Sequence, residues 1–509
     1  MESLTSGIKL YNTGQLPESI EFFLKSTDNT ASLYYLCTLS TTGYDTKINI
    51  IKLLKCNLNR YSIKTRLELL NIISSHFPRE TYLLYLQIYN QFDLIPRIKL
   101  YILHQLVSNA TTNADMASRL QHCKAALDIQ VSDKFVCLYM LTRPYLTSSD
   151  PITPVSESGT LIDLNEHFET NKHVYTQPII RVNQKKDHTN IGFVTSDLDK
   201  NGLCMFSRDI INSLDPKKFK VFVYYDDSHI SYNNQSIKTN NDVTWVSIYE
   251  KHTNTIYHQI HETHKIDILF DLVTFRSPKI VRLFATRPAP VQINYLGYSN
   301  DTHLDCYTHT LPNIILWKTL TPVTGINFQP TMLSTNRTQI IIGIMNSPLH
   351  ISLKCVMTYN AISSRHKNVL FVVKSTTPIP KLKNVLYITT PTTSLEDYYN
   401  IFNGFDYVID TFPYSGTTTT AASLYMGCPV LTFYNPDALS TSNSSSSMNI
   451  NSGLSKYVFK SLPAILKFDF KQFRDNYNRK QLRKKFLNCM NPVTFLNCFE
   501  KMLLNYKIK

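Results

Sequence analysis

A run of small and hydroxyl-bearing residues at 410–423, DTFPYSGTTTTAAS, is the stretch of this chain that best predicts chemistry. Three apolar residues at 407–409 precede it as a buried strand would, and residues 421–426 follow it as a helix that Gly427 and Pro429 would end. The first-turn amides of a helix lack intrahelical partners, and its dipole adds partial positive charge there. The pattern therefore predicts an anion-binding site at the start of this helix.

The predicted ligands of this anion are Gly416 and four consecutive threonines, Thr417, Thr418, Thr419 and Thr420. Their hydroxyls can donate hydrogen bonds beside the helix amides, which is enough to hold a diphosphate without a metal. An ordinary N-cap in an α/β sheet would show the same spacing. Four β-branched residues in a row form helix poorly, and this favours the ligand-binding interpretation.

Length and composition indicate a large globular protein. A chain of 509 residues suggests two to four domains, and 43% hydrophobic residues is normal for large cores. The net charge of +14 permits acidic partners, but the basic residues are scattered apart from one dense run at 479–485. We interpret that run as a solvated helix face rather than a nucleic-acid patch, so nucleic acid is not expected as a partner.

The cysteines and the N-terminus indicate the compartment. Ten cysteines show neither a CxxC pair nor zinc-ligand spacing, which is typical of free thiols in a reducing compartment. The N-terminus lacks a signal sequence, and no apolar run approaches the ~18 residues of a membrane span. We expect a soluble intracellular protein of the cytoplasm or nucleus, without a membrane partner. The composition would also suit a large DNA virus, whose protein would act in the host cytoplasm, or an intracellular parasite.

The elements that position the anion site begin after an all-α region. Residues 1–147 show helical periodicity only, with amphipathic pieces near 63–76, 79–92, 95–108, 113–127 and 132–142. The pattern at 7–18 is similar to one unit of a tetratricopeptide repeat, and Gly43 and Tyr44 could start another. No clean 34-residue period exists, so the array is degenerate. A protein-docking surface and a plain helical domain that packs on its neighbour are both open.

Short apolar runs alternating with helical stretches follow a polar linker at 148–189. This alternation predicts parallel sheets covered by helices, in one doubly wound domain at 190–336 and a second at 337–467. Helices at 468–509 would return across the domain junction, and the Ser/Asn-rich residues 440–447 would form a loop. Two such domains would enclose a ligand cleft at the carboxyl ends of their strands. The predicted strands are 191–195, 219–225, 266–270, 290–295, 340–343, 369–373, 385–388, 407–409 and 429–432.

Two motifs resemble a known family. Residues 287–292, RPAPVQ, followed by YLGY at 295–298, and the run at 410–420 with SLYMG at 423–427 are similar to signatures of glycosyltransferase family 41. This family holds O-GlcNAc transferase and its SPINDLY branch, and residues 191–197 fit its first strand. The resemblance covers roughly residues 190 to 460, and a preceding tetratricopeptide-like array agrees with it.

The resemblance implies a GT-B fold that binds a nucleotide-sugar between two Rossmann-like domains. The implied reaction is inverting, metal-independent transfer of a sugar to Ser or Thr of intracellular proteins. The donor would be of the UDP-GlcNAc or GDP-fucose type, with no cofactor beyond this substrate. Thr417 in place of histidine, after Phe412, Pro413 and Tyr414, looks more like the SPINDLY branch.

The resemblance also implies site residues, position by position. Asn201 falls where O-GlcNAc transferase has an active-site histidine, and His350 falls where the family has a lysine that contacts the diphosphate. Tyr398 replaces a nucleotide-contacting histidine, and Ala422 replaces the acidic residue that holds the ribose. We assign Asn201 and His350 as catalytic and expect the nucleotide-sugar to be bound by Ser347, Thr393, Leu395, Tyr398, Gly416, Thr417, Thr418, Thr419, Thr420 and Ala422.

These replacements leave three hypotheses open. Asn201 can orient a hydroxyl but cannot act as a base near neutral pH, and Phe275 stands where the SPINDLY branch has a histidine. The chain is then an active protein O-glycosyltransferase with changed specificity, a catalytically silent relative that binds proteins, or a glycosyltransferase for a non-protein acceptor. Protein acceptors would dock on the helical repeats.

Overall fold

The computed structural model divides the chain into two compact units. The first comprises Met1–Thr111, Asp115–Val131 and Ser156–Ser158, and the second comprises Thr112–Ala114, Ser132–Val155 and Gly159–Lys509. The residues that the structure describes are 5–6, 8–10, 62–73, 78–109, 116–145, 154–169, 188–196, 207, 210–226, 242–298, 302–311, 338–376, 378–390, 392, 394–434, 443–472, 476–489 and 492–506.

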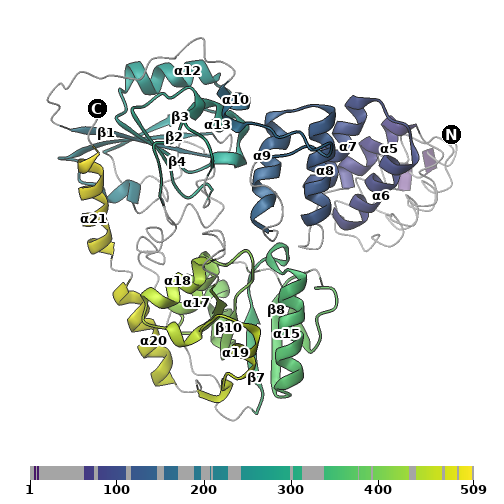
Figure 1. The fold of residues 1–509 in the computed structure, drawn as a ribbon, viewed down its shortest axis with the longest axis vertical. Coiled ribbons are helices and arrows are strands. Elements are labelled where there is room, and N and C mark those ends of the chain that lie inside the picture. Colours follow the sequence, from purple (N-terminus) through teal and green to yellow (C-terminus); the bar gives the residue numbers. More distant parts are fainter. Residues whose placement is uncertain are drawn as a thin grey trace. The chain divides into compact units, whose positions relative to one another are not determined.

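The described part of the first unit is helical, as the periodicity predicted. Leu84, Ile102, Leu106 and Leu120 are buried where successive helices pack on one another. Most of the tetratricopeptide-like pattern at 7–18, and Gly43 with Tyr44, lie outside the described residues. The helices are α5 (Ile63–Ile73), α6 (Pro78–Gln91), α7 (Pro96–Ser108) and α8 (Met116–Ile129) (Figure 1).

The second unit contains two lobes, each built on a parallel six-stranded sheet. The N-terminal lobe has the doubly wound strand order β3-β2-β1-β4-β5-β6. All its strands are parallel, and the order in which the chain adds them reverses between β1 and β4. Helices α12 (Thr253–His258) and α13 (Pro278–Ala285) lie between these strands in the sequence. The short strands β3 and β6 were not predicted. The strands are β1 (Thr189–Thr195), β2 (Phe219–Tyr225), β3 (Val243–Ser247), β4 (Ile268–Asp271), β5 (Val291–Asn294) and β6 (His309–Thr310).

The C-terminal lobe repeats this plan with the order β12-β11-β10-β7-β8-β9, reversing between β7 and β10. Two Rossmann-like lobes preceded by helices confirm the predicted GT-B fold class. The strands are β7 (Ile340–Ile344), β8 (Val369–Lys374), β9 (Val385–Ile388), β10 (Tyr407–Ile409), β11 (Val430–Phe433) and β12 (Val458–Phe459). The helices are α15 (Leu353–Arg365), α16 (Leu395–Ile401), α17 (Thr418–Tyr425), α18 (Ser444–Asn451) and α19 (Leu462–Leu466).

One loop prediction was wrong. The structure places Ser444–Asn451 in α18, so the Ser/Asn-rich residues from Ser444 onward are helical, whereas 440–442 lie outside the described residues. Ser444, Ser445 and Ser446 are buried, and Ser446 Oγ donates to the Asn443 carbonyl at 3.0 Å. Poor intrinsic helix formers are helical here because their hydroxyls have partners within the protein.

The chain segment after the first unit is fixed to the N-terminal lobe. Helix α9 (Asp133–Thr142) begins with Asp133, whose carboxylate forms a bidentate ion pair with the Arg282 guanidinium of α13. The bond from Arg282 Nη2 to Asp133 Oδ1 is 2.6 Å. The turn η3 (Arg143–Tyr145) follows α9 directly, so this pair also restrains the position of η3.

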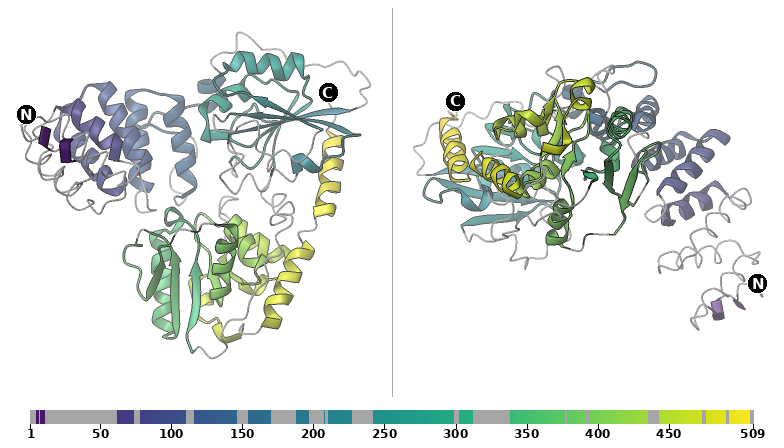
Figure 2. Two further views of the ribbon diagram at one scale, coloured as in Figure 1. Left: turned by 180° about the vertical axis from the view of Figure 1, so that it is seen from behind. Right: turned by 90° about the horizontal axis from the view of Figure 1, so that it is seen from below.

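Two C-terminal helices pack on different lobes (Figure 2). Helix α20 (Asn476–Cys489) contacts α17, where Arg483 lies 4.0 Å from the centre of the Tyr425 ring. Helix α21 (Pro492–Asn505) packs on the N-terminal lobe, where Phe499 meets Phe270 at a ring separation of 5.7 Å. None of the described helices is long and apolar enough to cross a membrane.

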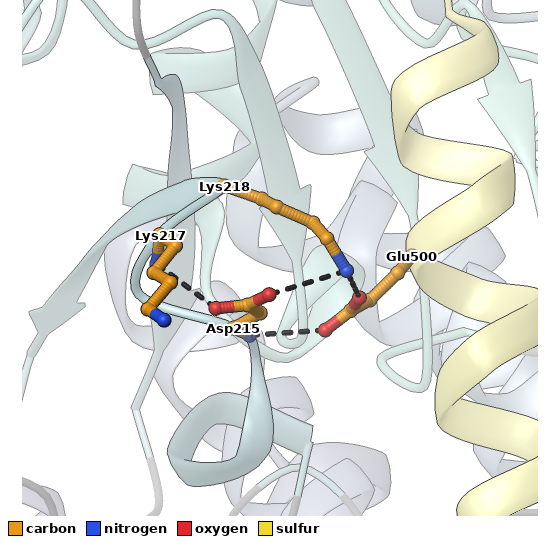
Figure 3. A network of polar contacts seen from close by, with 4 residues as sticks. All are labelled: Asp215, Lys217, Lys218 and Glu500. Carbon is orange, nitrogen blue, oxygen red and sulfur yellow. Dashed lines mark hydrogen bonds and ion pairs between the residues drawn. The ribbon is translucent and has the colours of Figure 1, made fainter.

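Glu500 of α21 supplements this packing with polar contacts (Figure 3). Its carboxylate accepts hydrogen bonds from the Asp215 amide at 2.9 Å and from Lys218 Nζ at 2.8 Å. Asp215 Oδ2 lies 3.2 Å from the same ammonium. These bonds tie α21 to the start of β2.

We predict that Phe499→Ala lowers the free energy of unfolding by about 3–5 kcal/mol, because it removes a buried ring and leaves a cavity. Urea unfolding followed by circular dichroism measures the change. Leu504→Ala on the same helix is the control, since Leu504 is 53% exposed. Equal losses in both variants would contradict the packing described for α21.

Candidate functional site

The candidate site lies where the order of the C-terminal sheet reverses. Strands β7 and β10 are neighbours there, and Asn346 and Asp410 follow their carboxyl ends. Loops at such a reversal form a crevice outside the sheet, which is where doubly wound domains bind ligands. The residues predicted from the threonine run therefore stand at the expected place in the fold.

The buried carboxylate of Asp410 organises the loop that follows β10. It accepts hydrogen bonds from the Gly416 amide at 2.8 Å, Ser415 Oγ at 2.8 Å, Thr432 Oγ1 at 3.0 Å and Asn346 Nδ2 at 3.1 Å. Burial raises the pKa of Asp410, and these hydrogen bonds act in the opposite direction. The loop folds so as to satisfy this one acceptor.

The loop closes tightly at Gly416, where a side chain would meet polar neighbours at short range. A Cβ there would lie 3.1 Å from Asp410 Oδ1 and 3.2 Å from the Asn346 side-chain amide. Those atoms would have to shift by a few tenths of an ångström, which would disturb the hydrogen bonds that they make. The glycine therefore permits the close approach of backbone to carboxylate.

Ser445, at the start of α18, joins that helix to the same loop. Its amide donates to Ser415 Oγ at 2.9 Å, and its hydroxyl donates to the Gly416 carbonyl at 2.7 Å. The Ser445 and Thr420 hydroxyl oxygens are 2.5 Å apart. Both hydroxyls are buried, so this network is internal to the lobe.

The four threonines are unequally placed. Helix α17 begins at Thr418, three residues earlier than the sequence predicted, and its first internal bond runs from the Ala421 amide to the Thr417 carbonyl at 3.0 Å. Thr420 is buried, Thr417 and Thr419 are half-buried, and Thr418 is exposed. The amides of Thr418 to Thr420 precede the first intrahelical donor, so they are available to an anion together with the exposed Thr418 hydroxyl.

His350 packs beside this loop. Its ring is 4.4 Å from the Tyr414 ring and 5.4 Å from the Tyr145 ring, measured between centres. Its Nδ1 atom is enclosed and has no hydrogen-bond partner among the residues that the structure describes. Burial lowers the pKa of His350 to about 4, so the imidazole is neutral near pH 7.

Tyr398 and Thr419, both predicted ligands, lie together. Burial raises the pKa of Tyr398 to about 12, and a hydrogen bond with Thr419 acts in the opposite direction. The start of α16 is fixed by a capping box in which Ser394 and Asp397 bond each other's backbone amides. Ala422 is buried on α17 and brings no polar group.

The remaining predicted residues are described only in part. Ser347 precedes the turn η6 (Pro348–His350), and its hydroxyl accepts a bond from the Leu349 amide at 3.4 Å. Leu395 is the first residue of α16. Asn201 and Thr393 lie outside the described residues. Phe275 is buried edge-on against Tyr298, 5.0 Å away between ring centres.

Sequence reasoning missed three residues at the site. Asn346 follows the apolar strand β7, a signal that could have found it, because strand ends at a sheet reversal carry ligands. Ser445 was missed because the stretch that contains it was predicted to be a loop. Tyr145 lies far away in sequence and carries no local signal. Among the described residues, no group of three or more His, Cys, Asp or Glu could hold a metal.

Comparisons with known proteins agree with this fold. No protein-family model matches the chain. Probable UDP-N-acetylglucosamine–peptide N-acetylglucosaminyltransferase SPINDLY from Arabidopsis thaliana is 26% identical over 48% of this chain and 30% of the relative. The relative of the same name from Hordeum vulgare is 27% identical over 48% of this chain and 29% of its own length. The chain thus matches less than a third of these relatives.

A solved structure supports the fold over nearly the whole chain. A mutant O-GlcNAc transferase from Thermobaculum terrenum matches 99% of this chain and 95% of its own, with a TM-score of 0.67 and 17% identity. The resemblance of this chain to the O-GlcNAc transferase and SPINDLY proteins of glycosyltransferase family 41 is therefore confirmed.

We predict that Asp410→Ala lowers the free energy of unfolding by at least about 3 kcal/mol, because several buried donors lose their shared acceptor. Asp305→Ala, at an exposed position, should change it little. Urea unfolding of both variants tests this. A loss below about 1 kcal/mol for Asp410→Ala would show that the loop donors find other partners.

His350 should make stability depend on pH. The pKa of His350 falls from 6.5 to about 4 on folding, so between these values the unfolded chain binds the proton and the folded chain does not. The contribution of His350 to the free energy of unfolding is then fully present above pH 6.5. It falls as the pH drops toward 4, by about 2 kcal/mol after allowance for partial exposure.

His350→Gln should remove this part of the dependence. Unfolding free energies of wild type and variant from pH 4.5 to 7.5 test the prediction. His252→Gln, at an exposed position, is the control and should keep the wild-type slope. Parallel curves for wild type and His350→Gln would contradict it.

Proposed function

We propose that this chain, which resembles glycosyltransferase family 41, transfers a sugar from a nucleotide-sugar to hydroxyl side chains of proteins. The observation that carries the proposal is the start of α17, where unpaired amides and Thr418 stand at the sheet reversal. The SPINDLY relatives, whose name describes peptide N-acetylglucosaminyltransferases, support the reaction class. Nothing in the proposal requires a cofactor or a metal.

The loop would act on the leaving group. When the bond from the sugar C1 atom to the diphosphate breaks, charge grows on the phosphate, and a helix N-terminus stabilises that charge more than it stabilises the bound donor. An acceptor hydroxyl attacks C1 from the opposite face, which inverts its configuration, and gives up its proton. Asn201 would orient this hydroxyl but cannot take the proton, so water or another group must do so.

His350 would contribute differently from the lysine it replaces. A neutral imidazole can donate a hydrogen bond to a phosphate oxygen but adds no charge, since the pKa of His350 is about 4. The positive potential at the phosphate would then come from the helix dipole and the amides. Nearby, Tyr398 and Thr419 would contact the nucleotide, together with the start of α16 at Leu395, whereas Ala422 could give the ribose no hydrogen bond.

Protein acceptors would dock on the helical unit, and nucleic acid is not part of the proposal. We place the protein inside the cell, in the cytoplasm or nucleus. Seven cysteines of the described residues are free, five of them buried, which suits a reducing compartment.

A catalytically silent scaffold is the alternative, and the apolar Ala422 with the uncharged His350 favours it. Thermal unfolding with millimolar UDP, GDP, UDP-GlcNAc or GDP-fucose separates the two. A ligand at 100 times its Kd stabilises by about 2.7 kcal/mol. If none of the four raises the melting temperature, the scaffold interpretation holds.

We predict that Thr418→Val lowers sugar transfer about 10- to 100-fold, because a donor to the leaving phosphate is lost. Its melting temperature should stay near wild type, since Thr418 is exposed. Radiolabelled transfer from UDP-GlcNAc and GDP-fucose onto total cell protein is the measurement. Thr244→Val, also exposed, is the matched control. Unchanged kinetics in Thr418→Val would exclude the loop from the mechanism.

A further inference from the structure

Tyr145 contacts two residues of the candidate site from a distant part of the sequence. Its ring stacks on Tyr414 with 4.7 Å between centres and 9° between planes, and it lies 5.4 Å from His350. Tyr414 belongs to the loop that Asp410 organises, and His350 belongs to η6. The three rings form one cluster, which we call the aromatic cap (Tyr145, His350 and Tyr414).

The position of Tyr145 is set from the N-terminal lobe. Tyr145 ends η3, which follows α9, and α9 is held by the ion pair between Asp133 and Arg282 of α13. Helix α9 also packs against η5 (Thr274–Arg276). Tyr145 thus reaches the C-terminal loop from a segment that is fixed to the other lobe.

Tyr414 transmits its position through neighbouring bonds to residues 415–420, which we call the phosphate loop. Its carbonyl accepts a bond from Thr411 Oγ1 at 2.8 Å. The next residue, Ser415, bonds the Asp410 carboxylate and accepts the Ser445 amide. A shift of the Tyr414 ring would therefore disturb the turn that leads into α17.

The aromatic cap also accounts for the enclosure of the Nδ1 atom of His350, a residue that is half-buried as a whole. Two rings cover the imidazole, and its Nδ1 finds no partner among the described residues. The titratable or charged groups around it are the Tyr145 phenol from η3 and the Tyr414 phenol from the loop. Tyr298 and Arg276 from the N-terminal lobe interact electrostatically with Tyr414. No carboxylate of the described residues is paired with this imidazole.

We infer that Tyr145 is a positioning residue of the donor site: its ring holds Tyr414 and the phosphate loop in place and keeps water from the Nδ1 atom of His350. The description of this site as a donor site rests on the proposed function. The contact itself does not depend on any reaction. Its consequence is that a segment joined to the helical region takes part in forming the nucleotide-sugar site.

The first test follows the imidazole of His350 by NMR with ¹³C-labelled histidine, assigned by loss of its signal in His350→Gln. In wild type, this ring should titrate near its low pKa of about 4. In Tyr145→Ala, water reaches the ring, so its titration should move up by more than about one pH unit. Tyr145→Phe keeps the ring and should titrate as wild type does. Tyr249→Ala removes a tyrosine that is 43% exposed and is the matched control.

The second test measures UDP and GDP binding to the same variants by calorimetry. Tyr145→Ala should bind about tenfold more weakly at pH 7.5, because the loop is no longer held in its binding geometry. The affinity of Tyr145→Ala for the nucleotide should improve as the pH falls, because the His350 ring, now exposed to water, becomes cationic. Wild type should show no such rise above pH 5. Tyr145→Phe should restore wild-type binding. A loss of folding alone would not produce this pH profile or this rescue.

Two results would overturn the inference. One is a His350 titration in Tyr145→Ala that matches wild type, and the other is unchanged nucleotide affinity in a variant whose titration has moved. If wild type binds neither UDP nor GDP, the proposed function fails, while the His350 titration still decides whether Tyr145 covers the ring.

Discussion

A carboxylate buried at the end of a strand is the constraint on which the candidate site depends. Asp410 has almost no contact with water, and an acceptor in that position is costly unless donors surround it. The chain supplies those donors from Asn346 just after β7, from the turn that follows Asp410 and from β11. The turn that results delivers the backbone to the first residue of α17 in one geometry. For the proposed anion site, a turn fixed in this way means that no reordering is needed when a ligand arrives.

The N-terminal lobe uses the same device. Asp271 ends β4, the strand beside the reversal of that sheet, and is fully buried. It accepts bonds from the Val273 and Thr274 amides, both at 2.8 Å, and from the Tyr307 hydroxyl at 2.5 Å. In both lobes, burial raises the pKa of the aspartate against the effect of its hydrogen bonds. The two lobes thus share both their strand order and the way they fix the loop at the sheet reversal.

Sequence periodicity predicted the elements well where a strand is an uninterrupted apolar run, as at 369–373 and 407–409. It failed for three edge strands, β3, β6 and β12, each of which pairs with a single neighbouring strand. The threonine run was found from its types and spacing. Which threonine faces outward could not be found, because burial of Thr420 depends on Ser445, 25 residues away and in a helix predicted to be a loop. Tyr145 was beyond reach for the same reason, since no local pattern records a contact across 269 residues of chain.

Helix α17 is clamped at its far end as well. Gly427 follows it with a φ of 67°, and a Cβ there would lie 2.4 Å from the Arg479 carbonyl of α20. The Arg479 guanidinium bonds the Phe405 carbonyl just before β10. Helix α20 therefore packs against the C-terminal end of α17, the end opposite to the candidate anion site. A substitution in α20 that displaced this contact would shift α17 as a rigid element, so residues far from the loop help to set the position of the first turn of that helix.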